Sequence, residues 1–313
     1  SPIEGRSFKV IDPSNEEPCA EISLGGKKDV DSAVSAAKKA FETWAFSKKE
    51  ERLELLEKLY VVYKKRWAEM AKLISTEMGA PMKFSTQMQA ATGASHIKSF
   101  KNILKDFKFE KDLGEEKNNQ KLLYEPKGVC ALITPWNWPI NQVNLKVIPA
   151  LASACTVVLK PSEIAPLSSM LLAEMIDEVK FPAGVFNLVN GDGAETGDAL
   201  TSHPDINMIS FTGSTRAGAL ISQNAAKDFK RISLELGGKG ANIIFKDADP
   251  EAVARGVQRC FRNSGQSCNA PTRMLVEKSI YLETIEKVKK LANETKVDSP
   301  EKDGDHIGPV VSE

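Results

Sequence analysis

The region from Val129 to Leu236 alternates short apolar runs with longer amphipathic runs, and this alternation constrains the fold more than any other feature of the sequence. The short runs predict strands, and the longer runs predict helices. Predicted strands span 129–133, 156–159, 185–189, 208–211 and 232–236, and predicted helices span 143–154, 167–179, 195–200 and 215–226. Such an order favours an α/β fold with a mostly parallel sheet wrapped by helices. Ligands of these sheets bind beyond the carboxyl ends of the strands, so we expect the loops there to carry the function.

The N-terminal part of the chain reads as a scaffold of amphipathic helices. Asp29 is expected to cap a first helix, whose apolar side chains recur at helical spacing as far as Trp44. A second helix carries an apolar stripe from Leu53 to Trp67. A third is predicted over 67–78, with Gly79 as its stop signal. We interpret these stripes as core packing rather than as a binding surface.

Residues 107–124 differ from their surroundings, because charged and amide residues flank a predicted turn at 112–114. The segment is either a solvated excursion or a protruding β-hairpin that serves as an oligomerisation arm, since an exposed strand edge invites a partner strand.

Charge and cysteine usage exclude several classes of protein. The 313-residue chain carries 42 basic and 42 acidic residues, so no overall field attracts nucleic acid or an anionic membrane. Five cysteines without a CxxC pair and only three histidines argue against a disulfide framework or a zinc site, and we expect no metal. The longest apolar run, 147–159, is interrupted by Pro149 and too short to cross a bilayer, and no signal peptide opens the chain. We therefore expect a soluble, cytoplasmic protein of about two domains.

The loops after the first two predicted strands carry polar residues suited to catalysis and binding. Asn137 lies between two tryptophans and two prolines and could donate a hydrogen bond to a developing oxyanion, or it could bond its own backbone in a turn. Lys160 and Glu163 follow the second strand and suit the hydroxyls of a ribose. A carboxylate there would reject a 2′-phosphate and favour NAD over NADP, whereas an exposed ion pair is the alternative.

Two later loops add an anion site and an acid. The stretch 211–218 is a Gly/Ser/Thr turn that opens a helix, and free backbone N–H groups there suit a pyrophosphate. The Gly-Asp-Gly run at 191–193 does not extend into the GxGxxG fingerprint. Glu235 ends the last strand beside two glycines and is a candidate general base, or a solvated acid paired with Lys239.

Cys268 is the candidate nucleophile. It follows a helix-like run and lies in a short loop of serine, glycine and asparagine, whereas inert cysteines sit in apolar surroundings. The alternative is a small core residue, which is the commoner role of a lone cysteine in a reducing compartment.

The order of five loop motifs resembles the aldehyde dehydrogenase superfamily. The matching stretches are TPWNWP at 134–139, KPSE at 160–163, FTGSTRAG at 211–218, LELGGK at 234–239 and GQSC at 265–268. The resemblance runs from the Asp12-Pro13 turn to Glu313. It implies a Rossmann-like NAD-binding domain (1–106 and 125–236), an oligomerisation hairpin (107–124) and the N-terminal part of an α/β catalytic domain (237–313).

The resemblance also assigns roles to residues. It implies that the Cys268 thiolate attacks the aldehyde, that Asn137 holds the oxyanion, and that Glu235 activates water to hydrolyse the thioester. Cofactor contacts implied for NAD are Ile133, Thr134, Pro135, Trp136, Lys146, Lys160, Ser162, Glu163, Gly193, Phe211, Gly213, Ser214 and Leu236.

The family carries a later Glu-Ile-Phe-Gly-Pro-type stretch and a C-terminal strand that pairs with a neighbouring subunit, neither of which occurs in these 313 residues. We therefore expect the sequence to be part of a longer chain and to be inactive alone. We expect the full-length enzyme to be a homodimer or homotetramer. Two other functions stay open: a CoA-acylating dehydrogenase and an inactive nucleotide-binding fragment. The resemblance implies an aldehyde substrate of unspecified type, and we expect Trp138, Gln142, Ser267 and Asn269 along its tunnel.

Overall fold

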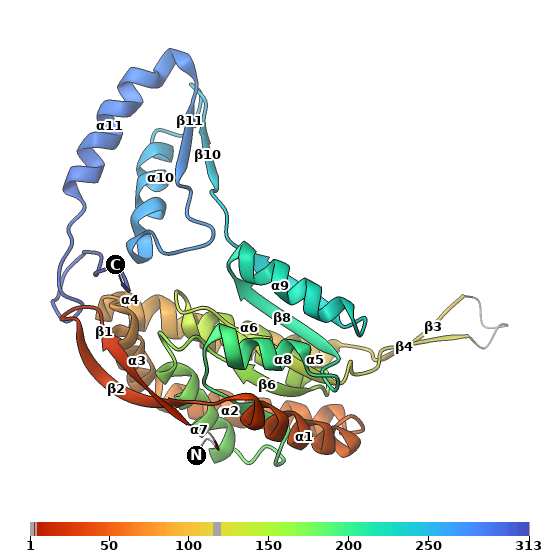
Figure 1. The fold of residues 1–313 in the computed structure, drawn as a ribbon. Coiled ribbons are helices and arrows are strands. Elements are labelled where there is room, and N and C mark those ends of the chain that lie inside the picture. The colour runs from red at the N-terminus through yellow and green to blue at the C-terminus, as the bar shows by residue number, and fades with distance from the viewer. Residues whose placement is uncertain (1–2, 4, 115–119, 313) are drawn as a thin grey trace.

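The computed structural model describes residues 3, 5–114 and 120–312, which form an arch with one projecting arm (Figure 1). The larger lobe holds the main sheet and most of the helices. The smaller lobe consists of strands β10 (Ala241–Ile244) and β11 (Arg273–Val276) and helices α10 (Ala252–Phe261) and α11 (Tyr281–Glu294). The arm is a two-stranded hairpin that points away from both lobes.

The main sheet has five parallel strands, as the alternating pattern predicts, and their order is β7-β6-β5-β8-β9. Their bounds are β5 (Val129–Ile133), β6 (Thr156–Lys160), β7 (Phe186–Leu188), β8 (Met208–Gly213) and β9 (Arg231–Leu236). Every residue of β5 and β6 is buried, as expected for central strands covered on both faces. The chain order reverses between β5 and β8, and such a reversal opens a crevice at the carboxyl ends of the strands.

Helices cover both faces of this sheet and form two cores. One core contains Leu132 and Val157 and packs against the N-terminal helices, whereas the other contains Ala131 and Val158, on the opposite face. The helices are α1 (Lys27–Trp44), α2 (Lys49–Lys65), α3 (Trp67–Met78), α4 (Met82–Phe84), α5 (Ala90–Asp106), α6 (Pro139–Ala152), α7 (Leu167–Glu178), α8 (Asp198–Ser202) and α9 (Thr215–Ala226). A π-helical turn, Ser85–Gln89, joins α4 to α5.

Three predicted helix starts are wrong. Helix α1 begins after Gly26, and Asp29 is its third residue, whose carboxylate reaches back to accept the Gly26 N–H at 3.0 Å. Helix α6 starts at Pro139, four residues before the predicted Val143, because proline fits the first turn of a helix. The helix predicted over 195–200 is a π-helical turn, Gly193–Gly197, followed by α8.

The stop of α3 at Gly79 is confirmed. Gly79 has φ 72°, a left-handed conformation that favours glycine. A Cβ there would lie 2.8 Å from Pro309 and 2.9 Å from Pro13. Two residues earlier, the fully buried Glu77 accepts the N–H groups of Leu167 and Ser168 at 2.5 and 3.2 Å, and its burial raises its pKa to about 7. Glu77 therefore caps α7.

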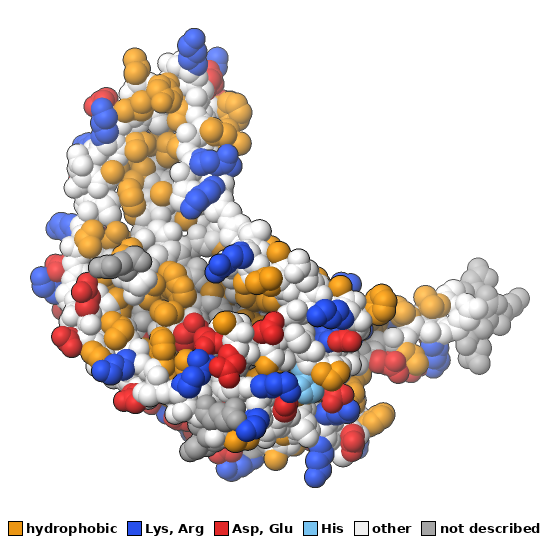
Figure 2. Space-filling view, viewed as in Figure 1, with side chains coloured by type: hydrophobic (Ala, Val, Ile, Leu, Met, Phe, Trp, Pro, Cys, Tyr) orange, Lys and Arg blue, Asp and Glu red, His pale blue; other side chains and the backbone are white. Residues whose placement is uncertain are grey.

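The predicted hairpin is present. Strands β3 (Glu110–Asp112) and β4 (Lys121–Leu123) pair antiparallel, and the Leu113 N–H still donates to the Gln120 carbonyl. The hydrogen-bonded ladder thus continues into the turn predicted at 112–114 as far as Leu113, and residues 115–119 lie outside the described residues. Leu122, Leu123 and Tyr124 are exposed, and hydrophobic side chains are visible along the arm (Figure 2).

The N-terminal hairpin and the segment after α11 complete the arch. Strands β1 (Arg6–Asp12) and β2 (Glu17–Leu24) pair antiparallel beside α3. Residues 295–312 return from α11 to the larger lobe, where the Met82 N–H donates to the Pro300 carbonyl at 3.0 Å. Among the described residues, no helix has the length and hydropathy needed to cross a membrane.

Candidate active site

A sharp turn at the end of α10 presents Cys268. Asn263, Ser264 and Gly265 have φ values of 56°, 57° and 75°, so three consecutive left-handed residues redirect the chain. Cys268 emerges from this turn exposed to solvent, whereas Cys130 and Cys155 are buried. The alternative interpretation of Cys268 as a small core residue is therefore wrong.

Asn263 supports this turn, and no motif in the sequence identified its role. Its side chain is buried and donates to the carbonyls of Asn137 and Gln266 at 2.9 and 3.2 Å. Gln89 in turn donates to the Asn263 side-chain oxygen at 3.2 Å. Asparagine tolerates the left-handed conformation better than most residues, which is the only local signal that the sequence contains.

The loops at 134–139 and 262–268 are joined by two further hydrogen bonds. The Asn137 amide donates to the Gln266 carbonyl at 2.8 Å, and the Trp138 indole donates to the Ser267 hydroxyl at 2.8 Å. Asn137 therefore bonds across the site instead of to its own backbone, and the local-turn alternative is wrong. An amide nitrogen has two hydrogens, so a second donor remains on Asn137.

Lys146 on α6 and Glu235 at the end of β9 interact electrostatically. The buried Lys146 ammonium donates to the Ser210 hydroxyl at 3.0 Å. Burial lowers the pKa of Lys146 to about 8, and the negative charge of Glu235 opposes that shift. Glu235 is exposed at the end of β9, and no ion pair joins it to Lys239 in the described part of the chain.

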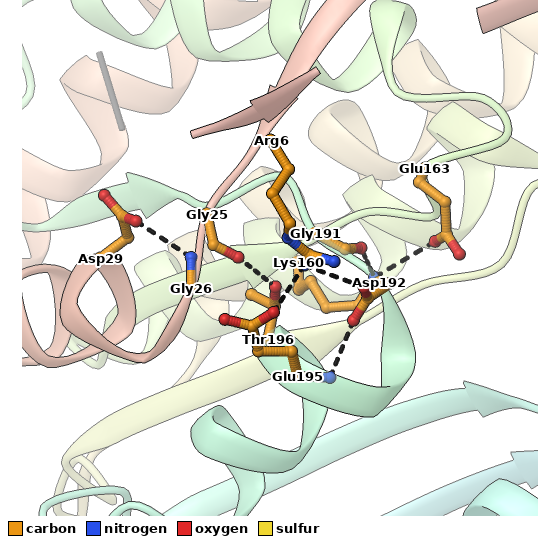
Figure 3. A network of polar contacts seen from close by, with 10 residues as sticks. All are labelled: Arg6, Gly25, Gly26, Asp29, Lys160, Glu163, Gly191, Asp192, Glu195 and Thr196. Atoms are coloured by element: carbon orange, nitrogen blue, oxygen red, sulfur yellow. Dashed lines mark hydrogen bonds and ion pairs between the residues drawn. The ribbon is translucent and has the colours of Figure 1, made fainter. Parts of the chain in front are cut away.

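Lys160 and Glu163 are neighbours, as their spacing suggested, but the lysine is buried. The Lys160 ammonium lies 3.5 Å from the Glu163 carboxylate and donates to the Gly191 carbonyl (Figure 3). It also donates to the Pro161 carbonyl at 3.0 Å. Its burial lowers its pKa, and Glu163 partly opposes that shift. The alternative of an exposed ion pair is wrong, because only Glu163 remains accessible to a ligand.

Arg6 makes ion pairs close to Lys160 that the sequence did not indicate. Its guanidinium lies 2.9 Å from both Asp192 and Glu195 (Figure 3). Asp192 caps the following turn by accepting the Glu195 N–H at 2.8 Å. The Thr196 hydroxyl donates to the Gly25 carbonyl at 2.5 Å. Strand β1 and the β2–α1 junction thus fix the loop that holds Lys160.

The predicted anion site lies at the turn between β8 and the start of α9. Ser214 caps α9 and accepts the Ala217 N–H at 3.2 Å. Gly213 is required, because a Cβ there would lie 2.4 Å from the Phe211 ring. The buried hydroxyl oxygens of Thr134 and Thr212, at the ends of β5 and β8, have no hydrogen-bond partner within the described residues. Unsatisfied donors beside a helix start fit a phosphate-bearing ligand.

The remaining predicted cofactor residues lie at or near the same edge of the sheet. Ile133 and Phe211 are paired across β5 and β8, and Leu236 ends β9. The others follow strand ends: Thr134, Pro135 and Trp136 after β5, Ser162 after β6, and Gly193 at the start of the π-helical turn, with no atom within 4 Å of its would-be Cβ. Their contacts with a cofactor stay a prediction.

Comparison with known proteins agrees with this arrangement. A family model described as "Aldehyde dehydrogenase family" matches residues 2–313. The chain is 49% identical over 313 residues to the protein from Pseudomonas sp. named 3-succinoylsemialdehyde-pyridine dehydrogenase. That match covers 99% of this chain and 65% of the relative, so the chain spans less than two thirds of its length.

Solved structures share the fold over the whole chain. An aldehyde dehydrogenase from Bartonella henselae is 58% identical with a TM-score of 0.97, covering 100% of this chain and 66% of its own. A mutant of aldehyde dehydrogenase C from Pseudomonas syringae, in complex with NAD+ and octanal, is 43% identical with a TM-score of 0.97, covering 100% and 64%. The chain described here belongs to the aldehyde dehydrogenase family.

Proposed function

We propose that the protein oxidises an aldehyde to a carboxylic acid with NAD through covalent adducts on Cys268. The observation that supports this most is the pair of interlocked loops, in which the exposed Cys268 follows Ser267 and Gln266, the hydrogen-bond partners of Trp138 and Asn137. A thiol and an amide donor held together at a strand edge suit attack on a carbonyl and stabilisation of the oxygen that becomes charged.

The first half of the proposed reaction forms a thioester. The Cys268 sulfur bonds to the carbonyl carbon, and the carbonyl oxygen becomes an oxyanion held by the second Asn137 N–H. NAD, when bound, would accept the hydride that this adduct releases. The collapse of the oxyanion restores the C=O bond as the C–H bond breaks and its electron pair departs with the hydride, and it leaves an acyl group on the Cys268 sulfur.

Glu235 carries the second half of the proposed reaction. Its exposed carboxylate accepts a proton from water, and the resulting nucleophile attacks the thioester carbon. The carboxylic acid leaves, and Cys268 returns as a thiolate. In a CoA-acylating dehydrogenase, by contrast, the acyl group would pass to a thiol, and no general base for water would be needed.

The corner around Lys160 supports NAD as the cofactor. Glu163 is the accessible carboxylate there, and it can accept hydrogen bonds from a ribose diol while repelling a 2′-phosphate. A structure of betaine aldehyde dehydrogenase from Staphylococcus aureus, 33% identical over 98% of this chain with a TM-score of 0.94, contains NAD+. Lys146, Gly213 and Ser214 complete the proposed contacts along the crevice.

The proposed division of labour follows the three parts of the fold. Residues 1–106 and 125–236 bind NAD, residues 107–124 form the contact arm of a homodimer or homotetramer, and residues 237–313 contribute the nucleophile. The exposed Leu123 and Tyr124 on the arm support its role as a subunit contact. The protein would act in the cytoplasm on a small-molecule aldehyde.

Replacing the nucleophile tests the proposed function. In the full chain, Cys268→Ala should abolish NADH formation from aldehydes while NAD binding, measured by fluorescence titration, is retained. Cys260→Ala is the matched control, because Cys260 lies on the same segment, only half-buried, and should keep wild-type activity. Substantial turnover by Cys268→Ala would refute the proposal, and a requirement for CoA would favour the acylating alternative.

A further inference from the structure

Two buried cysteines are neighbours at the amino-terminal edge of the main sheet, the edge opposite the candidate active site. Cys130 is the second residue of β5, and Cys155 directly precedes β6. Cys130 is paired with Val157 across the two strands, so Cys155, two residues before Val157, faces the same side of the sheet. The Cys130 thiol donates a hydrogen bond to the Cys155 sulfur. The two thiols are therefore in direct contact.

The Cys155 sulfur is an acceptor of hydrogen bonds. The Lys127 N–H donates to it at 3.3 Å. The Cys130 thiol has one hydrogen, and the other acceptor within its reach, the Gly128 carbonyl, is 3.9 Å away. The hydrogen bond from Cys130 is the main cause that lowers the pKa of Cys155 below its ordinary value, and burial opposes this shift. The same hydrogen bond raises the pKa of Cys130, so one thiol ionises while the other keeps its proton.

A buried arginine interacts with the ionised sulfur. Arg52 on α2 donates to a carbonyl at the end of α6 at 2.9 Å, and its positive charge attracts a negative charge on Cys155. The other charges that act on Arg52 are those of Glu50 and Glu51, which are exposed. Lys127 adds a second positive charge beside the pair. Positive charge next to a thiolate is typical of cysteines that react with oxidants.

The pair lies below the surface but close to it. Cys155 is 4% exposed and Cys130 is 2% exposed. The turns in front of β5 and β6 include the exposed Lys127 and the half-buried Ser153. Ala154 in the second turn has a left-handed φ of 61°. Turns of this kind open locally at a lower free energy than central strands do, so a small peroxide can reach Cys155 while the sheet stays folded.

We propose that Cys155 and Cys130 form a peroxide-reactive thiol pair that closes to a disulfide between β5 and the start of β6. The Cys155 thiolate attacks one peroxide oxygen, so that an S–O bond forms, the O–O bond breaks, and the departing hydroxide takes up a proton to become water. The Cys130 sulfur then attacks the resulting sulfenic acid on Cys155. An S–S bond forms, and the hydroxyl group leaves with the Cys130 proton as a second water. The inference does not depend on the proposed function, because neither step involves Cys268.

Peptide mapping after peroxide treatment tests the pair. The full chain carrying Cys268→Ala is reduced, treated at pH 7 with an equimolar amount of hydrogen peroxide, and alkylated. Trypsin separates the two cysteines, because Lys146 lies between them. Mass spectrometry should find the peptides of Cys130 and Cys155 joined and lighter by two hydrogen atoms. Cys19 is exposed, but burial of its sulfur raises its pKa, so it should be oxidised at least about threefold more slowly than Cys155.

Three variants in the same chain assign the roles. Cys130→Ser keeps a hydrogen-bond donor and should stop the reaction at a sulfenic acid on Cys155, which dimedone traps. Cys155→Ser should abolish the cross-link and leave Cys130 reduced. Cys19→Ser is the matched control and should not change the cross-link. The inference would be overturned if the peroxide is consumed without the cross-link, if Cys19 is oxidised before Cys155, or if Cys155 joins any cysteine other than Cys130.

Discussion

The hydrogen bond between Trp138 and Ser267 offers a quantitative test of how the two loops position Cys268. Trp138→Phe removes the indole N–H, which donates to the Ser267 hydroxyl at 2.8 Å, but keeps an aromatic ring against Phe84. Ser267→Ala removes the acceptor. A neutral hydrogen bond of this kind contributes about 0.5–1.5 kcal/mol, so each change should lower kcat/KM by roughly two- to twelvefold through the loop.

Each single variant also changes the surface that faces the aldehyde, and a double-mutant cycle removes that contribution. If the hydrogen bond positions the loop, Trp138→Phe combined with Ser267→Ala should cost less than the two single changes added together, by about 1 kcal/mol. The measurement is kcat/KM for one uncharged aldehyde, such as methyl 4-oxobutanoate, in wild type, both single variants and the double variant.

Trp136 provides the matched control, because it is the second indole of the same motif and no hydrogen bond connects it to Ser267. A cycle of Trp136→Phe with Ser267→Ala should be additive within about 0.3–0.5 kcal/mol. An additive result for Trp138 as well would refute the idea that this hydrogen bond couples the loops.

Three further variants test other parts of the fold. Arg6→Ala should raise the KM for NAD about two- to threefold with little change in kcat, because its exposed ion pairs with Asp192 and Glu195 contribute only about 0.2–1 kcal/mol each; an unchanged KM would remove β1 from the cofactor site. Gly79→Ala should lower the free energy of unfolding in urea by at least about 1 kcal/mol, because its φ is 72° and a Cβ would meet Pro309 at 2.8 Å, and a loss below 0.5 kcal/mol, on the order of a neutral surface change, would contradict this. Lys146→Met should be more stable than wild type at pH 7. Burial lowers the pKa of Lys146 in the folded protein to about 8 from its ordinary value of 10.5, so the unfolded chain binds more protons between these values. Wild type therefore loses about 3 kcal/mol of stability as the pH falls from 10.5 to 8. The advantage of the variant should therefore shrink at pH 10, and a difference independent of pH would show that burial does not disfavour the charge.

The main sheet could be predicted because its signals are local. Strand β5 is a fully buried apolar run, and the helix after β8 begins at Thr215, directly after the serine that caps it. The stop of α3 at Gly79 also depends on a single residue and its neighbours. In these places the intrinsic preference of the residues agrees with the fold.

Other features could not be predicted because they depend on contacts between distant segments. Asn263 bonds to Asn137, 126 residues earlier, and its role follows only from the meeting of two loops. Arg6 meets Asp192 by way of a hairpin that no periodicity placed near β6. The start of α6 was missed for a different reason, because Pro139 can either extend a loop or begin a helix.

The position of the returning segment has a consequence for the synthesis of the protein. The Val311 N–H donates to the Gln266 side chain, and Ser264 donates to the Gly308 carbonyl, each at 2.8 Å, and Gln266 also holds Asn137. While the chain is being made on the ribosome, the parallel sheet can form long before these partners have emerged. The loop that carries Cys268 therefore lacks two of its hydrogen-bond partners until Gly308 and Val311 have been synthesised and have left the ribosome.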